Sequence, residues 1–172
     1  SRGPLLTLEP QGLFYQRVKP EDAVKIVQKT VVAGEVIQSF LYKPPGVKET
    51  IAKVSDIPFF AKQTKLVLKR VGRIDPFDIR DAIAEGAYEG LAKVLAGMTP
   101  QQVIEEIKIS RLRGRGGAGF PTGIKWESCA GQPGRHYVIC NGDEGDPGAF
   151  MDASVMEGDP HAVLEGMAIA AY

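Results

Sequence analysis

The sequence has 172 residues, enough for one ordinary domain or for a small domain joined to part of another. Hydrophobic residues make up 44% and charged residues 24%, a composition typical of soluble globular proteins. Lysine plus arginine number 21, and so do aspartate plus glutamate, so the formal net charge is zero. A chain without net charge has no global field that would attract nucleic acid or an anionic membrane surface.

Membrane insertion and secretion are not expected. No apolar run reaches the roughly 18–20 residues that a membrane-spanning helix needs, and the N-terminus lacks the apolar core of a signal peptide. The two cysteines, Cys129 and Cys140, form neither a CxxC metal motif nor a disulfide framework. We therefore expect free thiols and a cytoplasmic location.

Residues 1–43 are expected to form a small α+β unit. Alternating apolar residues predict strands, and Pro20 followed by acidic residues predicts the first turn of a helix. The expected elements are strands at 5–9, 13–18 and 36–42 and a helix from Pro20 to Gly34. Because about 40 residues rarely form a stable core alone, this unit is expected to be the tail of a larger domain.

A break follows. Pro44-Pro45-Gly46 interrupts the chain and a mixed stretch continues to Pro58, which predicts a linker over residues 44–58. The second domain is then expected to begin at residue 59 and to continue to residue 172.

The second domain is expected to mix helices and strands. Its predicted elements are a strand at 65–70, a helix or helix pair capped by Asp75 and broken near Gly86, a helix after the capping box of Thr99 and Gln102, a buried strand at 136–140, and a last helix after Asp159-Pro160. No stop signal follows the last helix, so we expect the sequence to be a piece of a longer protein.

A glycine-rich segment follows the capping-box helix. Gly114, Gly116 and Gly119 satisfy the spacing G-x-G-x-x-G, and Gly117 adds a fourth glycine. The dinucleotide fingerprint needs a strand before the glycines, whereas a helix is predicted here, so an ordinary Rossmann interpretation is disfavoured. The uncovered backbone N–H groups would still let a flat ring or a phosphate approach closely.

Neighbouring side chains fit that interpretation. Arg115 and Lys125 can supply positive charge to a phosphate, and Phe120 can offer a ring face for stacking. A flexible surface loop remains the alternative on these residues alone.

An acidic segment, residues 141–148, follows the predicted buried strand. In open α/β sheets, ligands bind at the carboxyl ends of strands. Its candidate binding residues are Asn141, Asp143, Glu144 and Asp146. Hydrogen bonding to a ribose, a ribityl chain or a ring nitrogen is one interpretation and a solvated turn is another. A divalent metal site is disfavoured because the spacing lacks the EF-hand pattern, with no glutamate to complete the loop.

Two stretches, 112–126 and 137–150, resemble the signature segments of the flavin-bearing, NADH-oxidising subunit of respiratory complex I and of NAD(P)-linked hydrogenases. The motif Asp159-Pro160-His161 continues this similarity. Residues 14–42 resemble the end of a thioredoxin-like [2Fe–2S] region, and residues 75–100 resemble the helical lead-in of the hydrogenase relatives.

The resemblance implies an α/β fold with an atypical Rossmann-like flavin-binding core, preceded by a small α+β remnant of a thioredoxin-like domain. It places the glycine-rich segment and Lys125 against FMN, with Asn141, Asp143 and Glu144 hydrogen-bonded to the ring or ribityl chain. Phe120 would stack on the adenine of the nucleotide, and Asp146 would contact that nucleotide. The implied cofactor-binding residues are Gly114, Arg115, Gly116, Gly117, Gly119, Phe120, Lys125, Asn141, Asp143, Glu144 and Asp146.

The implied activity is that of an NADH dehydrogenase: hydride transfer from NAD(P)H to FMN, then electron transfer to iron–sulfur clusters, with no protein base required. Partners would be a thioredoxin-like ferredoxin subunit and an iron–sulfur subunit, and the cysteines of a [4Fe–4S] cluster are expected beyond Tyr172. Residues 1–172 alone are expected to hold no cluster and to bind FMN weakly. NADH and NADPH both remain open. The alternative function is a non-catalytic subunit-docking module.

Overall fold

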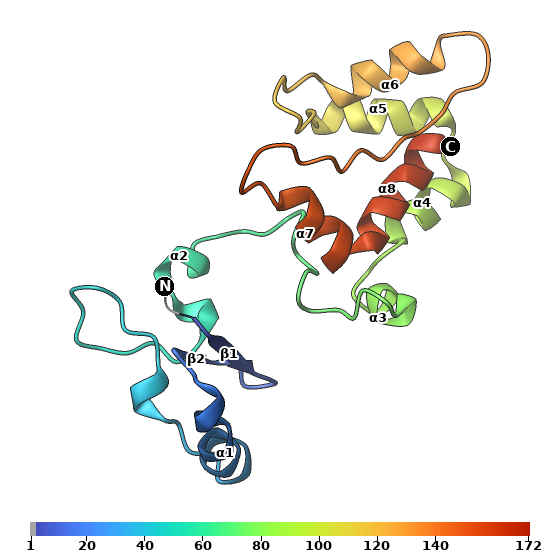
Figure 1. Ribbon diagram of the computed structural model, residues 1–172. Helices are drawn as coiled ribbons and strands as arrows, with labels where there is room; N and C mark the ends of the chain where they lie inside the picture. Colours follow the sequence, from blue (N-terminus) through green and yellow to red (C-terminus); the bar gives the residue numbers. More distant parts are fainter. Residues whose placement is uncertain (1–2) are drawn as a thin grey trace. The chain divides into compact units, whose positions relative to one another are not determined.

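The computed structural model describes residues 3–172, which form two compact units, residues 3–64 and Lys65–Tyr172 (Figure 1). We call these unit 1 and unit 2. No helix in the described part of the chain combines the length and the apolar character needed to cross a membrane.

Unit 1 begins with a hairpin, as predicted. Strand β1 (Leu5–Leu8) pairs antiparallel with β2 (Leu13–Gln16). The turn between them places Gly12 at a φ of +66°, a conformation that glycine adopts without steric cost. Tyr15 is fully buried, and its hydroxyl accepts a hydrogen bond from the backbone N–H of Ile37 at 2.9 Å.

The predicted helix follows the hairpin. It consists of a 3-10 turn η1 (Pro20–Asp22), α1 (Ala23–Ile26) and a π-helical turn η2 (Val27–Val32). Gly34, at a φ of +69°, lies just beyond its end. Ile26 is the buried side chain of this helix and packs in one core with four others: Leu13, Tyr15, Ile37 and Leu41.

The strand predicted at 36–42 is wrong. The chain there forms a 3-10 turn, η3 (Gln38–Phe40), and Leu41 and Tyr42 make only isolated bridges to Tyr15 and Ile51. The side chain of Gln16 donates to the carbonyl of Leu41 at 2.8 Å, so an amide side chain occupies an acceptor that a strand ladder would use. Unit 1 ends with two short unpredicted elements, η4 (Val54–Asp56) and α2 (Pro58–Ala61).

Unit 2 contains helices without a β-strand among residues 65–172. The strand predicted at 65–70 is wrong, because the chain there runs through bends and turns. A helix pair does follow: α3 (Ile79–Ala84) and α4 (Glu89–Gly97) are separated near Gly86, which has a φ of +82°. The predicted break is therefore confirmed.

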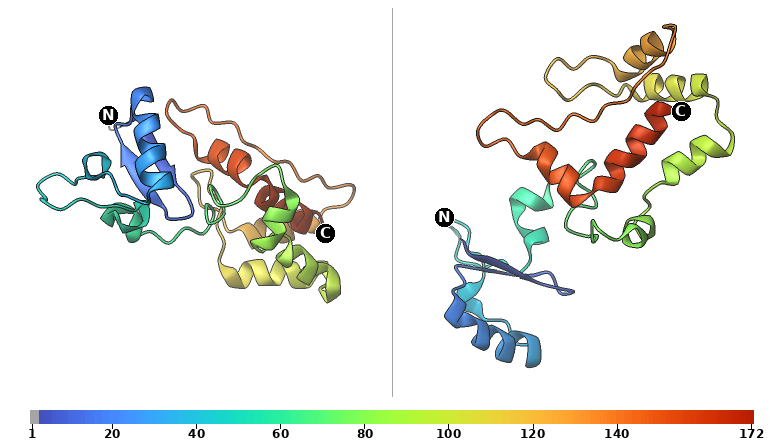
Figure 2. Two further views of the ribbon diagram at one scale, coloured as in Figure 1. Left: turned by 90° about the horizontal axis from the view of Figure 1, so that it is seen from below. Right: turned by 45° about the vertical axis from the view of Figure 1, so that its right-hand side comes forward.

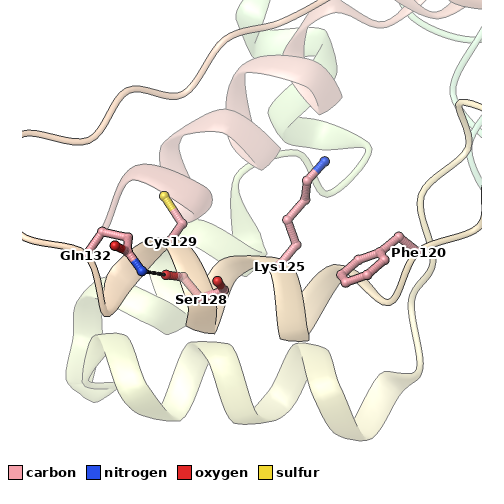
Figure 3. A pocket seen from close by; sticks show the side chains of 5 residues that line it. All are labelled: Phe120, Lys125, Ser128, Cys129 and Gln132. Carbon is pink, nitrogen blue, oxygen red and sulfur yellow. Dashed lines mark hydrogen bonds between the residues drawn. The ribbon is translucent and has the colours of Figure 1, made fainter.

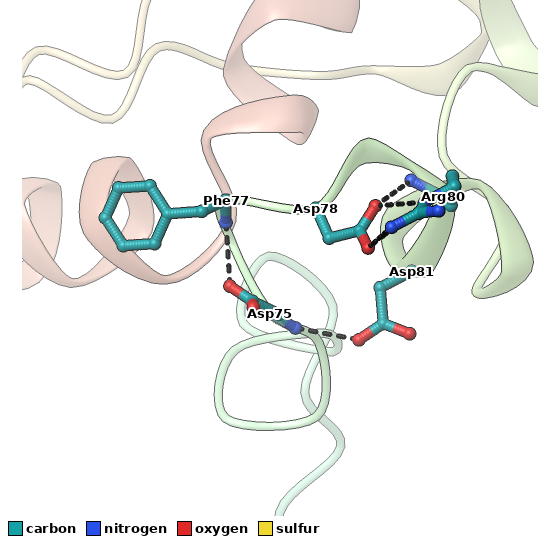
Figure 4. A network of polar contacts seen from close by, with 5 residues as sticks. All are labelled: Asp75, Phe77, Asp78, Arg80 and Asp81. Carbon is teal, nitrogen blue, oxygen red and sulfur yellow. Dashed lines mark hydrogen bonds and ion pairs between the residues drawn. The ribbon is translucent and has the colours of Figure 1, made fainter.

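The cap predicted for this helix pair is wrong by three residues. Asp78, not Asp75, is the N-cap of α3, and its carboxylate accepts from the backbone N–H of Arg80 at 2.9 Å (Figure 4). Asp75 instead accepts from the N–H of Phe77 at 2.9 Å in a turn before the helix. The hydrogen bond from the Arg80 side chain lowers the pKa of the Asp78 carboxyl below its usual value.

The next two helices pack against each other. Helix α5 (Pro100–Ser110) begins with the predicted capping box, in which Thr99 and Gln102 exchange hydrogen bonds. Helix α6 (Thr122–Ala130), which was not predicted, packs along α5. A Cβ atom on Gly123 would lie 2.8 Å from the backbone nitrogen of Lys108, so glycine permits this close approach.

The last two helices are α7 (Met151–Gly158) and α8 (Pro160–Ala171). Asp159 caps α8 as predicted, accepting from the N–H of Ala162 at 3.1 Å. Helix α8 packs against both α7 and α4, an arrangement that Figure 2 shows from two further sides. Helix α7 was not predicted.

The buried strand predicted at 136–140 is wrong. These residues carry no helix or strand, and the side chains of Tyr137 and Ile139 are 73% and 83% exposed. The physical reason is that no strand lies among the described residues of unit 2, so this apolar segment has no neighbour with which to form a ladder. The described structure is mainly helical with one small two-stranded sheet, a mixture compatible with the expected α/β class.

Candidate functional site

The glycine-rich segment forms a closed loop between α5 and α6. Its base is held by two backbone hydrogen bonds, from Gly114 N–H to the carbonyl of Phe120 and from Thr122 N–H to the carbonyl of Leu112, each 2.9 Å long. The guanidinium of Arg113 donates to the carbonyl of Gly119 at 3.0 Å, so a side-chain hydrogen bond also links the two sides of the loop. Packed helices on both sides therefore anchor the ends of this loop.

The tip of the loop has open backbone at three glycines. A Cβ atom placed on Gly116, Gly117 or Gly119 would meet no atom within 4 Å. Gly117 and Gly119 have φ values of +109° and +63°, which side-chain-bearing residues rarely adopt. The described hydrogen bonds of residues 3–172 include none from the backbone N–H groups of residues 115–119. These donors are accessible to a ligand.

A shallow, open depression of about 580 Å³ lies beside this loop, on α6. Its lining residues are Phe120, Lys125, Ser128, Cys129 and Gln132 (Figure 3). The structure thus brings together two predicted site residues, Phe120 and Lys125. The other lining residues were missed, because without α6 in view nothing in the sequence placed them on the same helix face.

The α5–α6 pair supports this depression from behind. The ammonium of Lys108 on α5 donates to the carboxylate of Glu127 on α6 at 3.0 Å. This hydrogen bond raises the pKa of Lys108 above its usual value. Glu127 lies in the same helix as Lys125, so the pair helps to fix the helix that carries a predicted phosphate contact.

The acidic segment is ordered largely by its own hydrogen bonds. The side-chain oxygen of Asn141 accepts from the N–H of Asp143 at 3.2 Å, closing an Asx turn. The carboxylate of Glu144 accepts from the N–H groups of Asp152 and Ala153, at 2.7 and 3.1 Å. Asp143 and Asp146 are exposed, and no described hydrogen bond uses their carboxylates.

The two predicted halves of the site share no described hydrogen bond or ion pair within residues 3–172. In Figure 1 the glycine-rich loop and the acidic segment extend toward the same end of unit 2. The view from below in Figure 2 separates them. The structure therefore brings residues together within each half, whereas contact between the halves remains a prediction.

A polar cluster at the start of α8 was missed by the sequence analysis. Arg70 and Asp159 form a buried ion pair at 2.8 Å, and Tyr88 hydrogen-bonds His161 at 2.9 Å. The carboxylate of Glu165 accepts from the backbone N–H groups at the start of α4, those of Tyr88, Gly90 and Leu91. These partners lie more than 70 residues apart in the sequence, so no local pattern could reveal them.

Comparison with known proteins finds a family model that matches the later part of unit 2. Residues 107–172 match the Nuo51 FMN-binding domain, so the match includes both the glycine-rich loop and the acidic segment. The chain is 56% identical over 112 residues to the NADP-reducing hydrogenase subunit HndC of Solidesulfovibrio fructosivorans. That match covers 64% of this chain and 22% of the relative.

Subunits of NADH-quinone oxidoreductases give similar matches. One from Rhizobium meliloti is 52% identical over 92 residues, which is 52% of this chain and 21% of the relative. Another, from Aquifex aeolicus, is 43% identical over 118 residues, 67% of this chain and 28% of the relative.

The chain thus spans about a quarter of the length of these curated relatives. The resemblance predicted from the two signature segments is confirmed: residues 107–172 match the Nuo51 FMN-binding domain, and the similar relatives are named as subunits of NADH-quinone oxidoreductases and of an NADP-reducing hydrogenase.

Proposed function

We propose that this chain is part of an NAD(P)H dehydrogenase flavin subunit of the complex I or hydrogenase type. In that role it would help to transfer hydride from NAD(P)H to FMN and electrons onward to iron–sulfur clusters. The observation that carries the proposal is that the open backbone at Gly116, Gly117 and Gly119 lies inside the segment matching an FMN-binding domain. The names of the relatives, which include NADH-quinone oxidoreductase and NAD-reducing hydrogenase subunits, support the same activity.

The residues of the glycine-rich loop suit a planar ring with a phosphate tail. The open space above Gly116, Gly117 and Gly119 leaves room for a flat ring, and the free N–H groups can donate to its polar edge or to phosphate. Arg115 and Lys125 would balance phosphate charge. We therefore propose that this loop and Lys125 hold FMN, with Gly114 closing the loop base.

The nucleotide is proposed to bind beside the flavin. Phe120 is 52% exposed and borders the depression on α6, so its ring is available to stack on adenine. The exposed carboxylate of Asp146 would accept from the nucleotide's hydroxyl groups. The carboxylates of Asp143 and Glu144 would accept from the flavin ring or ribityl chain, and the amide of Asn141 could accept from or donate to them.

FMN, when bound, would supply hydride acceptance and single-electron transfer. The part of this chain in the reaction is to bind and orient: the loop base fixes the donors, and the bare loop tip permits close stacking of a second ring. No side chain of the two segments is assigned a proton transfer.

The wider architecture is also a proposal. Residues 1–43 would be the end of a thioredoxin-like ferredoxin region, residues 44–58 a linker, and residues 59–172 the first part of an atypical Rossmann-like FMN- and nucleotide-binding domain. The α+β content of unit 1 supports this assignment. The complete protein would carry a [4Fe–4S] cluster, work in the cytoplasm, and assemble with a thioredoxin-like ferredoxin subunit and an iron–sulfur subunit.

The test is an FMN titration of the complete protein, followed by flavin absorbance and fluorescence. Replacement of Lys125 by alanine should weaken FMN affinity by about tenfold, since a charge-assisted contact to phosphate contributes more than an ordinary hydrogen bond. Lys93→Ala is the matched control, because Lys93 is an exposed lysine on α4 whose ion pair with Glu106 lies outside the glycine-rich loop and the depression on α6.

The two functions give different results in this titration. The dehydrogenase function is supported if the wild type shows flavin absorbance and if FMN affinity falls in Lys125→Ala but not in Lys93→Ala. A colourless complete protein that does not take up FMN but still assembles with partner subunits would contradict it and would favour the docking module.

A further inference from the structure

Glu144 connects the acidic segment to α7. One carboxylate oxygen accepts from the backbone N–H of Asp152 at 2.7 Å, and the other accepts from that of Ala153 at 3.1 Å. Both donors lie in the first turn of α7, where backbone N–H groups have no partner within the helix. A negative carboxylate at this position also suits the positive end of the helix dipole.

The helix has no cap of its own. Phe150 occupies the N-cap position of α7, and no side chain there accepts a hydrogen bond from the helix. Glu144, which lies eight residues before Asp152 in the sequence, therefore supplies the cap from the acidic segment. The segment and the helix depend on the same two hydrogen bonds.

A second contact fastens the same segment to the same helix. A Cβ atom on Gly142 would lie 2.4 Å from the sulfur of Met156, so the backbone at Gly142 lies directly against the Met156 side chain. Met156 is one turn beyond Ala153 in α7. The acidic segment thus contacts the flank of α7 at two successive turns, through Gly142 and through Glu144.

The two capping hydrogen bonds leave acceptor positions on the Glu144 carboxylate unused. An ionised carboxylate offers about four lone-pair positions, and α7 uses one on each oxygen. Glu144 can therefore hold α7 and still accept from a ligand.

We propose that Glu144 is a positioning residue that fastens the acidic segment to α7, so that ordering of α7 and binding of a planar flavin by the segment reinforce each other. The flavin half of this inference rests on the proposed function, whereas the fastening rests on the hydrogen bonds alone. By reciprocity, FMN should order α7 as much as an ordered α7 favours FMN.

Hydrogen exchange of the complete protein tests the fastening without FMN. In Glu144→Ala both acceptors are lost, and exchange of the amides of Asp152 and Ala153 should accelerate by about fivefold or more. Asp143→Asn removes the same charge from the same segment without removing a described hydrogen bond, so α7 should exchange as in the wild type. Unchanged exchange of α7 in Glu144→Ala would overturn the proposal.

A rescue variant separates capping from positioning. Phe150 is 69% exposed, and Phe150→Asp places a carboxylate at the N-cap of α7, where it can accept from the same N–H groups. In Glu144→Ala/Phe150→Asp, exchange of α7 should return to the wild-type rate while residues 141–146 stay fast-exchanging. Slow exchange of both segments in this double variant would mean that Glu144 does not fasten the segment.

Adding FMN completes the experiment. In the wild type, FMN should slow hydrogen exchange in α7 as well as in residues 141–146. The Glu144→Ala variant should bind FMN with lower affinity than the wild type. FMN binding that leaves α7 exchange unchanged overturns the coupling. Absence of FMN binding to the wild type, together with fast exchange of α7 in Glu144→Ala, overturns the proposed function and the coupling but leaves the fastening intact.

Discussion

Glycines close together in the sequence have different structural surroundings in this chain. Gly116 and Gly117 face open space, so their absence of a side chain matters only for a ligand or for backbone conformation. Gly123, by contrast, lies against the backbone of Lys108 and lets α5 and α6 approach. The sequence alone shows a run of glycines, and the structure separates those that face open space from one that permits close helix packing.

Gly123→Ala should destabilise unit 2. The added methyl would lie 2.5 Å from the Lys108 side chain and 2.9 Å from its Cα, so the backbone of the helix pair would have to shift to make room. Overpacking of this kind costs about 1–3 kcal/mol. Thermal or urea unfolding of the complete protein measures it, with Gly116→Ala as the control, because nothing lies within 4 Å of that position. Equal stability of the two variants would contradict the packing assignment.

At the scale of elements, two helix starts in unit 2 were predictable, whereas the strands expected there were not. Thr99 with Gln102, and Asp159 with Pro160, define their helix starts through side chains within a few residues, so the sequence contains all the partners needed. The residues at 136–140 have strand composition, but a strand also needs a neighbour, and the described part of unit 2 provides none. The capping of α7 by Glu144 was missed because the capping side chain is not adjacent to the helix.

Glu165 is expected to stabilise the start of helix α4. Its carboxylate accepts from three backbone N–H groups at that helix start, and Glu165→Ala would leave them without this acceptor. Loss of such charged hydrogen bonds costs about 1–3 kcal/mol, and the melting temperature should fall accordingly. Glu157→Ala removes an exposed glutamate on α7 and should leave the melting temperature nearly unchanged. A similar fall in both variants would show that the α4 contact is not the cause.

At the scale of the whole molecule, the resemblance to a flavoprotein family was predictable, but the cluster that organises unit 2 was not. The glycine-rich segment and the acidic segment are each an unbroken stretch of sequence. The match of residues 107–172 to the family includes both of them. The pairing of Arg70 with Asp159 joins residues 89 positions apart and depends on the packing of α8. The side chains of this pair are only 5% and 1% exposed, a burial that could be seen only in three dimensions.

Breaking that pair should weaken unit 2 more than any surface change. Asp159→Asn keeps the shape and an N-cap oxygen for α8 but leaves the Arg70 guanidinium buried without a counter-charge, which costs about 3–5 kcal/mol. Chemical denaturation measures the loss, and Arg80→Met, which breaks the exposed pair with Asp78, is the control. Equal losses of unfolding free energy in Asp159→Asn and Arg80→Met would show that burial does not explain the contribution of the Arg70–Asp159 pair.

The binding of FMN by the bare loop tip is tested most directly by an exchange footprint. Backbone amides of the complete protein are followed by hydrogen exchange with and without FMN. Slower exchange is expected at residues 115–119 and 141–146, with no change in the hairpin β1–β2. Saturation with FMN that leaves residues 115–119 exchanging at their unliganded rate would contradict the account.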